Sequence, residues 1–308
     1  MISVIMSAYK EKREWLEQAI LSILNQTYKN FELIITLDNP KNIELKQLIE
    51  EYSKKDNRII FIYNKENIGL TNCLNNMLKI VKGDYIARMD ADDISLSTRF
   101  EEQLKYMQNN NLDICGANII QFYKNENLNE IKNPSSFKNI KKYIYIKNCV
   151  AHPTFLVKRK VYDRLNGYNE VPTCEDYDFL LRAINAGYTI GNIPKFLLKY
   201  RLSPNSVSRK NLGKQVVLSE YISKYYKNNK DGLMNIDLIM KYMNTKRYKI
   251  KATRYDKYCY KKNQMLKNKK KNKIKYIIIL LSTIFYFDLL LKNIFEKYKL
   301  KKLLKVDG

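Results

Sequence analysis

The first 120 residues alternate short apolar runs with stretches of helical periodicity, and this alternation restricts the fold more than any other feature. Four runs have the length of β-strands: residues 2–6, 31–37, 59–63 and 85–89. Between them, apolar side chains recur every three or four positions, as on one face of a helix: Leu16, Ala19, Ile20, Ile23 and Leu24; Leu45, Leu48, Ile49 and Tyr52; Leu70, Leu74, Met77, Leu78 and Val81. This succession predicts right-handed βαβ units, and therefore an α/β fold with a mostly parallel sheet flanked by helices.

Acidic side chains follow two of these strand-like runs. Asp38 comes directly after the second run, and Asp90, Asp92 and Asp93 come directly after the fourth. The carboxyl ends of parallel strands meet at one edge of the sheet, and ligands bind there. We therefore expect Asp38, Asp90 and Asp92 to lie at the same edge.

The pair Asp90 and Asp92 predicts a cation-dependent site. Residues two apart on an extended backbone point the same way, and two neighbouring carboxylates repel each other unless a cation compensates. Mg²⁺ and Mn²⁺ bind carboxylate and phosphate oxygens, so a divalent metal carrying a diphosphate would fit. The alternative is an acidic turn before the next helix, with Asp93 or Ser95 as its N-cap.

The second half of the chain divides near residue 215. Before that point, a helix is predicted from near Thr173 to a stop at Gly187. Thr173 and Asp176 have the spacing of a capping box, which gives Asp176 an alternative role at the helix start. After that point the composition shifts to Tyr, Lys and Asn. We expect a catalytic domain over residues 1–215 and a helical, basic C-terminal extension over residues 216–308.

The positive charge is concentrated in that extension. The chain carries 56 basic and 31 acidic residues, and its net charge of +25 indicates an anionic partner. Residues 241–275 hold 15 of the basic residues and a single acid, Asp256. The apolar run at 276–287 is shorter than the ~20 residues that span a bilayer. Lysines beside a short apolar segment favour an anchor on an anionic membrane surface, against the alternative of a buried helix with a solvated lysine face.

The sequence also indicates a reducing, cytoplasmic compartment and argues against a nucleic-acid partner. The five cysteines are odd in number and include no C-x-x-C pair, which indicates a reducing compartment without disulfides or a zinc site. The chain opens on a strand pattern and not on a signal peptide, so a cytoplasmic location is expected. A nucleic-acid-binding face would interleave basic and aromatic residues, whereas here carboxylates occupy the ligand edge, so we expect no nucleic-acid partner.

Seven short motifs follow one another over residues 2–210. They are Ser3-Val-Ile-Met-Ser-Ala-Tyr9, Ile23-Leu-Asn-Gln-Thr-Tyr-Lys-Asn-Phe31, Asn67-Ile-Gly-Leu70, Tyr85-Ile-Ala-Arg-Met-Asp-Ala-Asp-Asp93, His152-Pro-Thr154, Glu175-Asp-Tyr-Asp178 and Tyr200-Arg201. In this order they resemble the family 2 glycosyltransferases of bacterial surface-polysaccharide synthesis, which have the Rossmann-like GT-A fold. The resemblance implies transfer of a hexosyl or N-acetylhexosaminyl group from a nucleotide sugar to a glycan or lipid-linked acceptor. It also suits an enzyme peripheral to the inner face of the cytoplasmic membrane, acting in lipopolysaccharide or capsule synthesis.

The resemblance implies a role for each candidate residue. The donor nucleotide, expected to be a uridine diphosphate, would contact Ala8, Tyr9, Asp38, Asn67 and Asp90. Asp38 would accept a hydrogen bond from the base, against the alternative of a turn-forming aspartate before Pro40. Asp92 would hold Mn²⁺ or Mg²⁺ on the diphosphate, where the metal acts as a Lewis acid.

On the acceptor side, the resemblance makes Asp176 the general base of a single displacement that inverts the anomeric carbon. It places His152 and Glu175 near the acceptor or in support of the site. Arg201 would contact the diphosphate, against the alternative of a surface salt bridge.

Two positions depart from the usual family pattern. Leu37 stands where a first aspartate is common, and Ser203 stands where many relatives carry a metal-binding histidine. A non-catalytic relative that binds nucleotide sugars is therefore one alternative. A nucleotidyltransferase is another, although it would usually have a Gly-rich, basic phosphate loop where this chain has Ser7-Ala8-Tyr9-Lys10.

Overall fold

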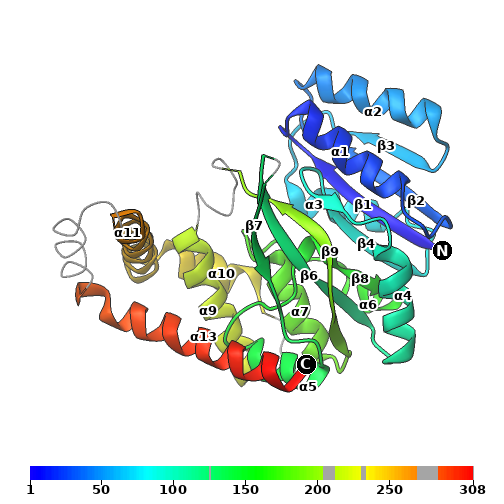
Figure 1. Ribbon diagram of the computed structural model, residues 1–308. Coiled ribbons are helices and arrows are strands. Elements are labelled where there is room, and N and C mark those ends of the chain that lie inside the picture. The colour runs from blue at the N-terminus through cyan, green and yellow to red at the C-terminus, as the bar shows by residue number, and fades with distance from the viewer. Residues whose placement is uncertain (125, 204–211, 230–233, 269–283, 308) are drawn as a thin grey trace.

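The computed structural model describes residues 1–124, 126–203, 212–229, 234–268 and 284–307 (Figure 1). Its first half alternates strands and helices: β1 (Ile2–Ala8), α1 (Arg13–Leu24), β2 (Phe31–Leu37), α2 (Ile43–Lys55), β3 (Ile59–Tyr63), α3 (Leu70–Leu78) and β4 (Tyr85–Asp90). The four strand-like runs and the three helical patterns of the sequence are thereby confirmed. Strands β2 and β3 have the predicted bounds, whereas β1 extends to Ala8 and β4 to Asp90.

The second half extends the sheet with strands of both directions. Its elements are β5 (Ile94–Ser95), α4 (Arg99–Asn109), β6 (Ile114–Tyr123), β7 (Glu126–Ile131), α5 (Phe137–Tyr143), η1 (His152–Thr154), β8 (Leu156–Lys158), α6 (Arg159–Leu165), α7 (Glu175–Asn185) and β9 (Ile190–Arg201). The strand order is β3-β2-β1-β4-β8-β6-β9-β5, with β7 paired on β6. Strands β1 to β4 are parallel, β8 runs antiparallel to both its neighbours, and β6 is parallel to β9.

Two hydrophobic cores lie on opposite faces of this sheet. Successive side chains of a strand point to opposite faces, so Ile5 of β1 joins one core while Val4 joins the other. The core of Ile5 includes Leu74 of α3 and Phe179 of α7. The core of Val4 includes residues of α1, α2 and α4, such as Leu104. The predicted α/β sheet with helices on both faces is therefore confirmed.

The basic extension shares a core with the preceding body of the chain. It consists of α9 (Leu212–Asn228), α10 (Ile236–Asn244), α11 (Lys246–Asn268), η2 (Ile284–Tyr286) and α13 (Phe287–Asp307). Ile222 of α9 and Leu303 of α13 are buried in the same core as α7. Near the end of α13, the Asp307 carboxylate accepts hydrogen bonds from the Ser135 N–H at 2.7 Å and from Asn139 Nδ2 at 2.8 Å. The extension is thus packed on the body at both of its ends.

Two predicted helix caps are wrong, although the helix predicted from near Thr173 to Gly187 is confirmed as α7. Helix α4 begins at Arg99 with Thr98 as its N-cap, so neither Asp93 nor Ser95 caps it. Helix α7 begins at Glu175, and its N-cap residue, Cys174, makes no side-chain cap hydrogen bond. Thr173 has a positive φ of 63° and stands one residue before the cap, so the predicted capping box does not form.

The apolar run of the extension is described only in part. Residues 276–283 lie outside the described residues, and 284–287 form η2 and the start of α13. Among the helices that the structure describes, none is long and apolar enough to cross a membrane.

The cysteines are free thiols, in agreement with the prediction of no disulfide framework. Four of them are buried: Cys73, Cys115, Cys149 and Cys174. Burial raises the pKa of Cys73, Cys115 and Cys149 to about 12, and it raises the pKa of Cys174 well above its usual value. These thiols are therefore protonated at neutral pH.

Candidate active site

The carboxyl ends of β1, β2 and β4 lie side by side. In the parallel register, Ser7 of β1 pairs with Asp90 of β4, and Ala8 pairs with Leu37 of β2. The Asp38 N–H continues this pattern by donating to the Ala8 carbonyl at 2.8 Å. The prediction that the acidic residues share one edge of the sheet is confirmed.

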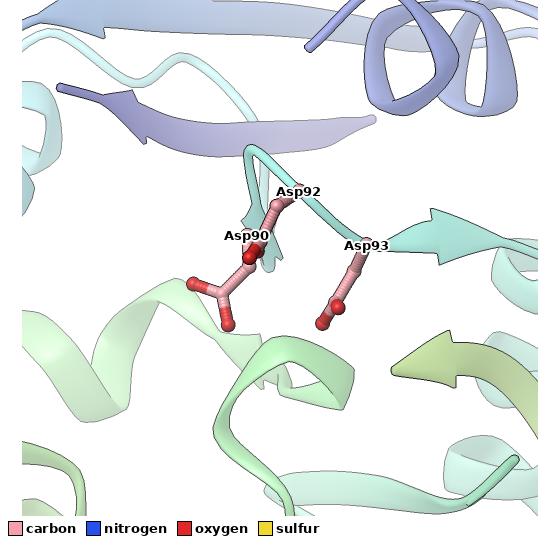
Figure 2. A group of neighbouring side chains, drawn as sticks. All are labelled: Asp90, Asp92 and Asp93. Carbon is pink, nitrogen blue, oxygen red and sulfur yellow. The ribbon is translucent and has the colours of Figure 1, made fainter. Parts of the chain in front are cut away.

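Three carboxylates gather at the turn between β4 and β5 (Figure 2). One side-chain oxygen from each of Asp90, Asp92 and Asp93 lies within 4.8 Å of the others. Asp93 is buried, and its Oδ2 has no hydrogen-bond partner in the described part of the chain. Hard oxygen donors at this spacing, one of them buried and unpaired, fit a Mg²⁺ or Mn²⁺ ion.

The acidic cluster is electrostatically strained in the absence of a cation. Burial, with the charges of Asp90 and Glu11 added, raises the pKa of Asp92 to about 7. Burial and the charges of Asp90 and Asp92 raise the pKa of Asp93 well above its usual value. A bound cation would favour the ionised form of each carboxylate and would lower these pKa values.

Glu11 is a fourth acid that sequence reasoning missed. Its side chain accepts a hydrogen bond from the Tyr9 N–H at 2.6 Å, and burial raises its pKa. The Tyr9 carbonyl accepts a second hydrogen bond from Asn39 Nδ2 at 2.9 Å. The chain at Tyr9 is therefore fixed, while the Tyr9 side chain is 40% exposed beside the sheet edge.

Arg201 secures the backbone of the acidic turn. Its Nε donates to the Asp92 carbonyl at 2.6 Å, and its backbone N–H donates to Asp93 Oδ1 at 2.8 Å. The guanidinium also packs over the rings of Trp15 and Phe122. Because Arg201 is buried in this way, the alternative of a surface salt bridge is wrong.

Arg88 places a positive charge below the acidic turn, and sequence reasoning missed it. It is 2% exposed, and its Nη2 pairs with Asp90 Oδ1 at 2.5 Å. Its Nε and Nη1 are buried without a hydrogen-bond partner in the described residues. The available signal was an arginine within an otherwise apolar, buried strand, where an ionised side chain needs a counter-charge.

The first turn of α7 brings two more carboxylates next to Arg88. Asp176 Oδ2 accepts a hydrogen bond from Asn148 Nδ2 at 2.8 Å, a contact that the sequence did not predict. Burial raises the pKa of Asp176 to about 6, opposed by nearby N–H groups and by the Arg88 charge. Burial and the charge of Asp176 raise the pKa of Glu175 further. Of the two neighbouring carboxyl groups, Asp176 is thus the one that ionises more readily.

His152 forms part of an aromatic wall beside this pair. Its Nε2 lies 3.0 Å from the Tyr168 hydroxyl, which lies 2.7 Å from that of Tyr162. Burial and the Arg88 charge hold the pKa of His152 well below its usual value, so the imidazole is neutral. His152 therefore supplies a hydrogen bond to the wall and no charge.

Asp38 holds the loop in front of α3. Its carboxylate accepts hydrogen bonds from the Ile68 and Gly69 N–H groups, both at 2.9 Å, and from Asn64 Nδ2 at 2.8 Å. The exposed Asn67 donates to the Asp38 carbonyl at 3.1 Å. Beside this loop is a cavity of about 200 Å³, which is lined by Ile68, Gly69, Leu70, Thr71, Asn72, Glu170 and Pro172. Base recognition by Asp38 stays a prediction.

Comparisons with known proteins show which sequences this chain is similar to. The sequence profile described as Glycosyl transferase family 2 matches residues 3–165. An uncharacterized glycosyltransferase of Methanocaldococcus jannaschii is 39% identical over 238 residues, which cover 76% of this chain and 82% of the relative. The O-antigen biosynthesis glycosyltransferase WbnJ of Escherichia coli is 39% identical over 212 residues, or 68% of this chain and 82% of the relative.

Solved structures share the fold at low sequence identity. The mannosyltransferase PcManGT of Pyrobaculum calidifontis, in complex with GDP-Man and Mn²⁺, has a TM-score of 0.60 at 14% identity and covers 98% of this chain and 84% of that one. S. aureus TarS 1–349, in complex with UDP-GlcNAc, has a TM-score of 0.57 at 16% identity and covers 72% of this chain and 66% of that one. These similarities show that the chain has the GT-A fold.

Proposed function

The chain belongs to glycosyl transferase family 2, and on that premise we propose that it transfers a hexosyl or N-acetylhexosaminyl group from a UDP-linked donor to an acceptor hydroxyl. The observation that carries the proposal is that one buried arginine connects the two groups of acids. Arg88 pairs with Asp90 of the acidic cluster at 2.5 Å, and its charge lowers the pKa of Glu175 and Asp176. This transfer requires a cation site for the diphosphate and a carboxylate base for the acceptor hydroxyl. The acidic cluster and Asp176 would supply them.

At the donor end, Asp92, with Asp90 and Asp93 beside it, would hold Mn²⁺ or Mg²⁺. When bound, such an ion supplies Lewis-acid stabilisation of the charge that develops on the departing diphosphate. Arg201 keeps these carboxylates in place by fixing the backbone of their turn. The nucleotide would lie along the edge formed by Ala8, Tyr9, Asp38 and Asn67.

At the acceptor end, Asp176 accepts the proton of the acceptor hydroxyl. The acceptor oxygen forms a bond to the anomeric carbon as the bond from that carbon to the phosphate oxygen breaks. The nucleoside diphosphate leaves with the electron pair, and the anomeric configuration is inverted because there is one displacement. Asn148 orients the Asp176 carboxylate by its hydrogen bond, and the Arg88 charge keeps that carboxylate ionised.

Relatives indicate the acceptor class. WbnJ is named for O-antigen biosynthesis, and a relative of Erwinia amylovora that is 31% identical is named for amylovoran biosynthesis. We propose that this chain likewise acts in lipopolysaccharide or capsule synthesis. Its acceptor would be a growing glycan or a lipid-linked sugar. The corresponding location is the cytoplasm, peripheral to the inner face of the membrane.

The test is release of nucleoside diphosphate from a panel of nucleotide sugars, with a mixture of glycan and lipid-linked acceptors, in Mn²⁺, Mg²⁺ or EDTA. We expect one donor to turn over with metal only, and Asp176→Asn to lower kcat by about 10²–10⁴-fold, because a general base is worth that much. The matched control is Asp163→Asn, an exposed acid on α6.

Donor affinity, measured by calorimetry on each variant, separates lost catalysis from misfolding. An Asp176→Asn enzyme that turns over within twofold of wild type would contradict the assignment of the base. Tight donor binding by the wild type, with no turnover on any acceptor, would favour the non-catalytic relative.

A further inference from the structure

Helix α13 is apolar on two opposite sides. One side packs on the body: Leu303 is buried in the shared core, and the carbonyl of Glu296 accepts a hydrogen bond from the Tyr143 hydroxyl. The other side exposes five large apolar side chains, each about half exposed or more: Phe287, Leu291, Ile294, Phe295 and Tyr298. Their spacing of three, four and one places them on one helix face. We call these five residues the α13 stripe.

The charges around the α13 stripe are predominantly positive. Helix α13 carries six lysines: Lys292, Lys297, Lys299, Lys301, Lys302 and Lys305. Its acids are engaged within the fold, since Asp288 pairs with Arg254, Glu296 lies beside Lys292 and Lys147, and Asp307 accepts the bonds to α5. Lys301, Lys302 and Lys305 lie three to seven residues beyond Tyr298 and continue the line of the stripe.

An open groove lies beside the start of the stripe. Its volume is about 470 Å³, and it lies between α11 and η2. The lining combines cationic and apolar groups from both elements: Lys249, Ile250, Thr253, Arg254, Lys257, Phe285 and Tyr286. Phe285 is 80% exposed and Ile250 is 66% exposed. The groove therefore has the same chemistry as the stripe, large apolar side chains with positive charge at their edge.

We propose that the α13 stripe and the adjoining groove are the surface by which the protein docks on an anionic lipid bilayer. The apolar side chains would enter the interfacial region, while the lysines would meet the lipid phosphates. This proposal rests on the proposed function and deepens it. It names the surface that would bring the active site to a lipid-linked acceptor in the membrane. It also assigns the contact to α13, η2 and the facing residues of α11, whereas the sequence pattern pointed to the apolar run at 276–287.

Two other occupants fit the surface less well. A second copy of the chain would bring two lysine-rich faces together, which like-charge repulsion opposes. A nucleic acid would match the lysines and the rings of the stripe, but it would leave the exposed aliphatic side chains of Leu291 and Ile294 without an apolar partner. An anionic membrane is the partner that satisfies both the charge and the aliphatic side chains.

Flotation of the full-length protein with lipid vesicles tests the proposal without donor, metal or turnover. We expect wild type to float with vesicles of phosphatidylcholine and phosphatidylglycerol, and far less with phosphatidylcholine alone. The triple variant Phe287→Ser, Leu291→Ser, Phe295→Ser is expected to bind at least about tenfold more weakly, since it removes most of the inserted apolar surface. The variant Lys301→Glu, Lys302→Glu, Lys305→Glu is expected to lose the preference for anionic lipid.

The matched control is Ile43→Ser with Leu128→Ser, two exposed apolar positions away from α13. It is expected to float like wild type, and circular dichroism checks that each variant is folded. The proposal is overturned if the triple variant floats like wild type, if wild type stays unbound, or if the triple variant instead abolishes a wild-type dimer in sedimentation. Release of nucleoside diphosphate in solution is expected to be unchanged by the triple variant, so failure of docking and failure of transfer are separate results.

Discussion

Arg88 is the residue on which the electrostatics of the site depend. Its guanidinium is buried next to Asp90, Glu175 and Asp176, and within the described part of the chain it makes one ion pair while Nε and Nη1 have no hydrogen-bond partner. A buried guanidinium with unmade hydrogen bonds is unfavourable for folding on its own account. Residues at functional sites often lower the stability of the fold while they serve the activity. The buried charge of Arg88 fits that pattern.

The pH dependence of the transfer rate should reveal the effect of the Arg88 charge on the pKa of Asp176. Asp176 acts as a base only when ionised, and its pKa is raised to about 6. The rate should therefore rise with pH up to about 6, roughly tenfold per unit below it, and then level off. In Arg88→Met the positive charge that lowers this pKa is lost, so the rising limb should move to higher pH by about half to one unit.

The same variant should keep its fold, because Asp90 is partly open to water and the substitution removes Nε and Nη1, which are buried without a partner among the residues that the structure describes. We expect its free energy of unfolding to stay within about 1–2 kcal/mol of wild type. Arg164→Met, at an exposed position on α6, is the control for loss of one positive charge. A rising limb that is identical in both variants would rule out this role for Arg88.

At the scale of elements, α7 carries the proposed base, Asp176, and is anchored by a buried ion pair. Asp178 and Arg182 are both inaccessible and pair at 2.8 Å, one helical turn apart. Asp178 also accepts a hydrogen bond from the Tyr226 hydroxyl of α9, and Arg182 donates to the carbonyls of Leu165, the last residue of α6, and of Gly167. One network thereby fixes the position of α7 relative to two other helices.

Asp178→Ala should test how strongly that network holds the fold. Removing one partner leaves the buried Arg182 charge uncompensated, so we expect a loss of about 3–5 kcal/mol in the free energy of unfolding by urea. Asp163→Ala breaks an exposed pair of the same i,i+4 spacing and should change it by less than about 0.5 kcal/mol. Equal effects of the two substitutions would show that the network contributes little.

The elements are also where sequence reasoning succeeded and failed. Periodicity located β1 to β4 and the shared edge of Asp38, Asp90 and Asp92, because parallel strands follow simple packing rules. It did not locate Asn148 or Glu11, whose approach to the site depends on the path of loops. The capping box failed because Thr173 adopts a left-handed conformation, whereas an N-cap residue needs an extended one.

At the scale of the whole molecule, body and extension form one packed unit. Helix α9 crosses residue 215, and its Val217, Leu218 and Ile222 are buried against the core of α7. The Gly213 N–H donates to Asp256 of α11 at 2.8 Å, so α11 is fixed to the start of α9. The amino-acid composition changes near residue 215, as predicted, but the residues on the two sides of that point pack in one core.

A truncation series should show this. We expect residues 1–215 to lack a cooperative thermal transition, because the cut removes the part of α9 that covers α7. Residues 1–268 keep the contact of α9 with α11 and should unfold cooperatively. Near-ultraviolet circular dichroism and a melting curve for each chain are the measurements. A sharp transition for residues 1–215 would instead establish the catalytic domain as an independent folding unit.

The four buried thiols make local opening of this unit measurable. A thiol-specific reagent reacts with the exposed thiolate, so each cysteine is silent until its own neighbourhood opens. Cys73 lies in α3, Cys115 in β6, Cys149 before η1, and Cys174 directly before the helix that carries Asp176. Pulsed labelling read by mass spectrometry would thus rank four regions of the wild-type chain by the free energy of their opening. It would show directly whether α7, the helix with the proposed base, opens before the sheet does.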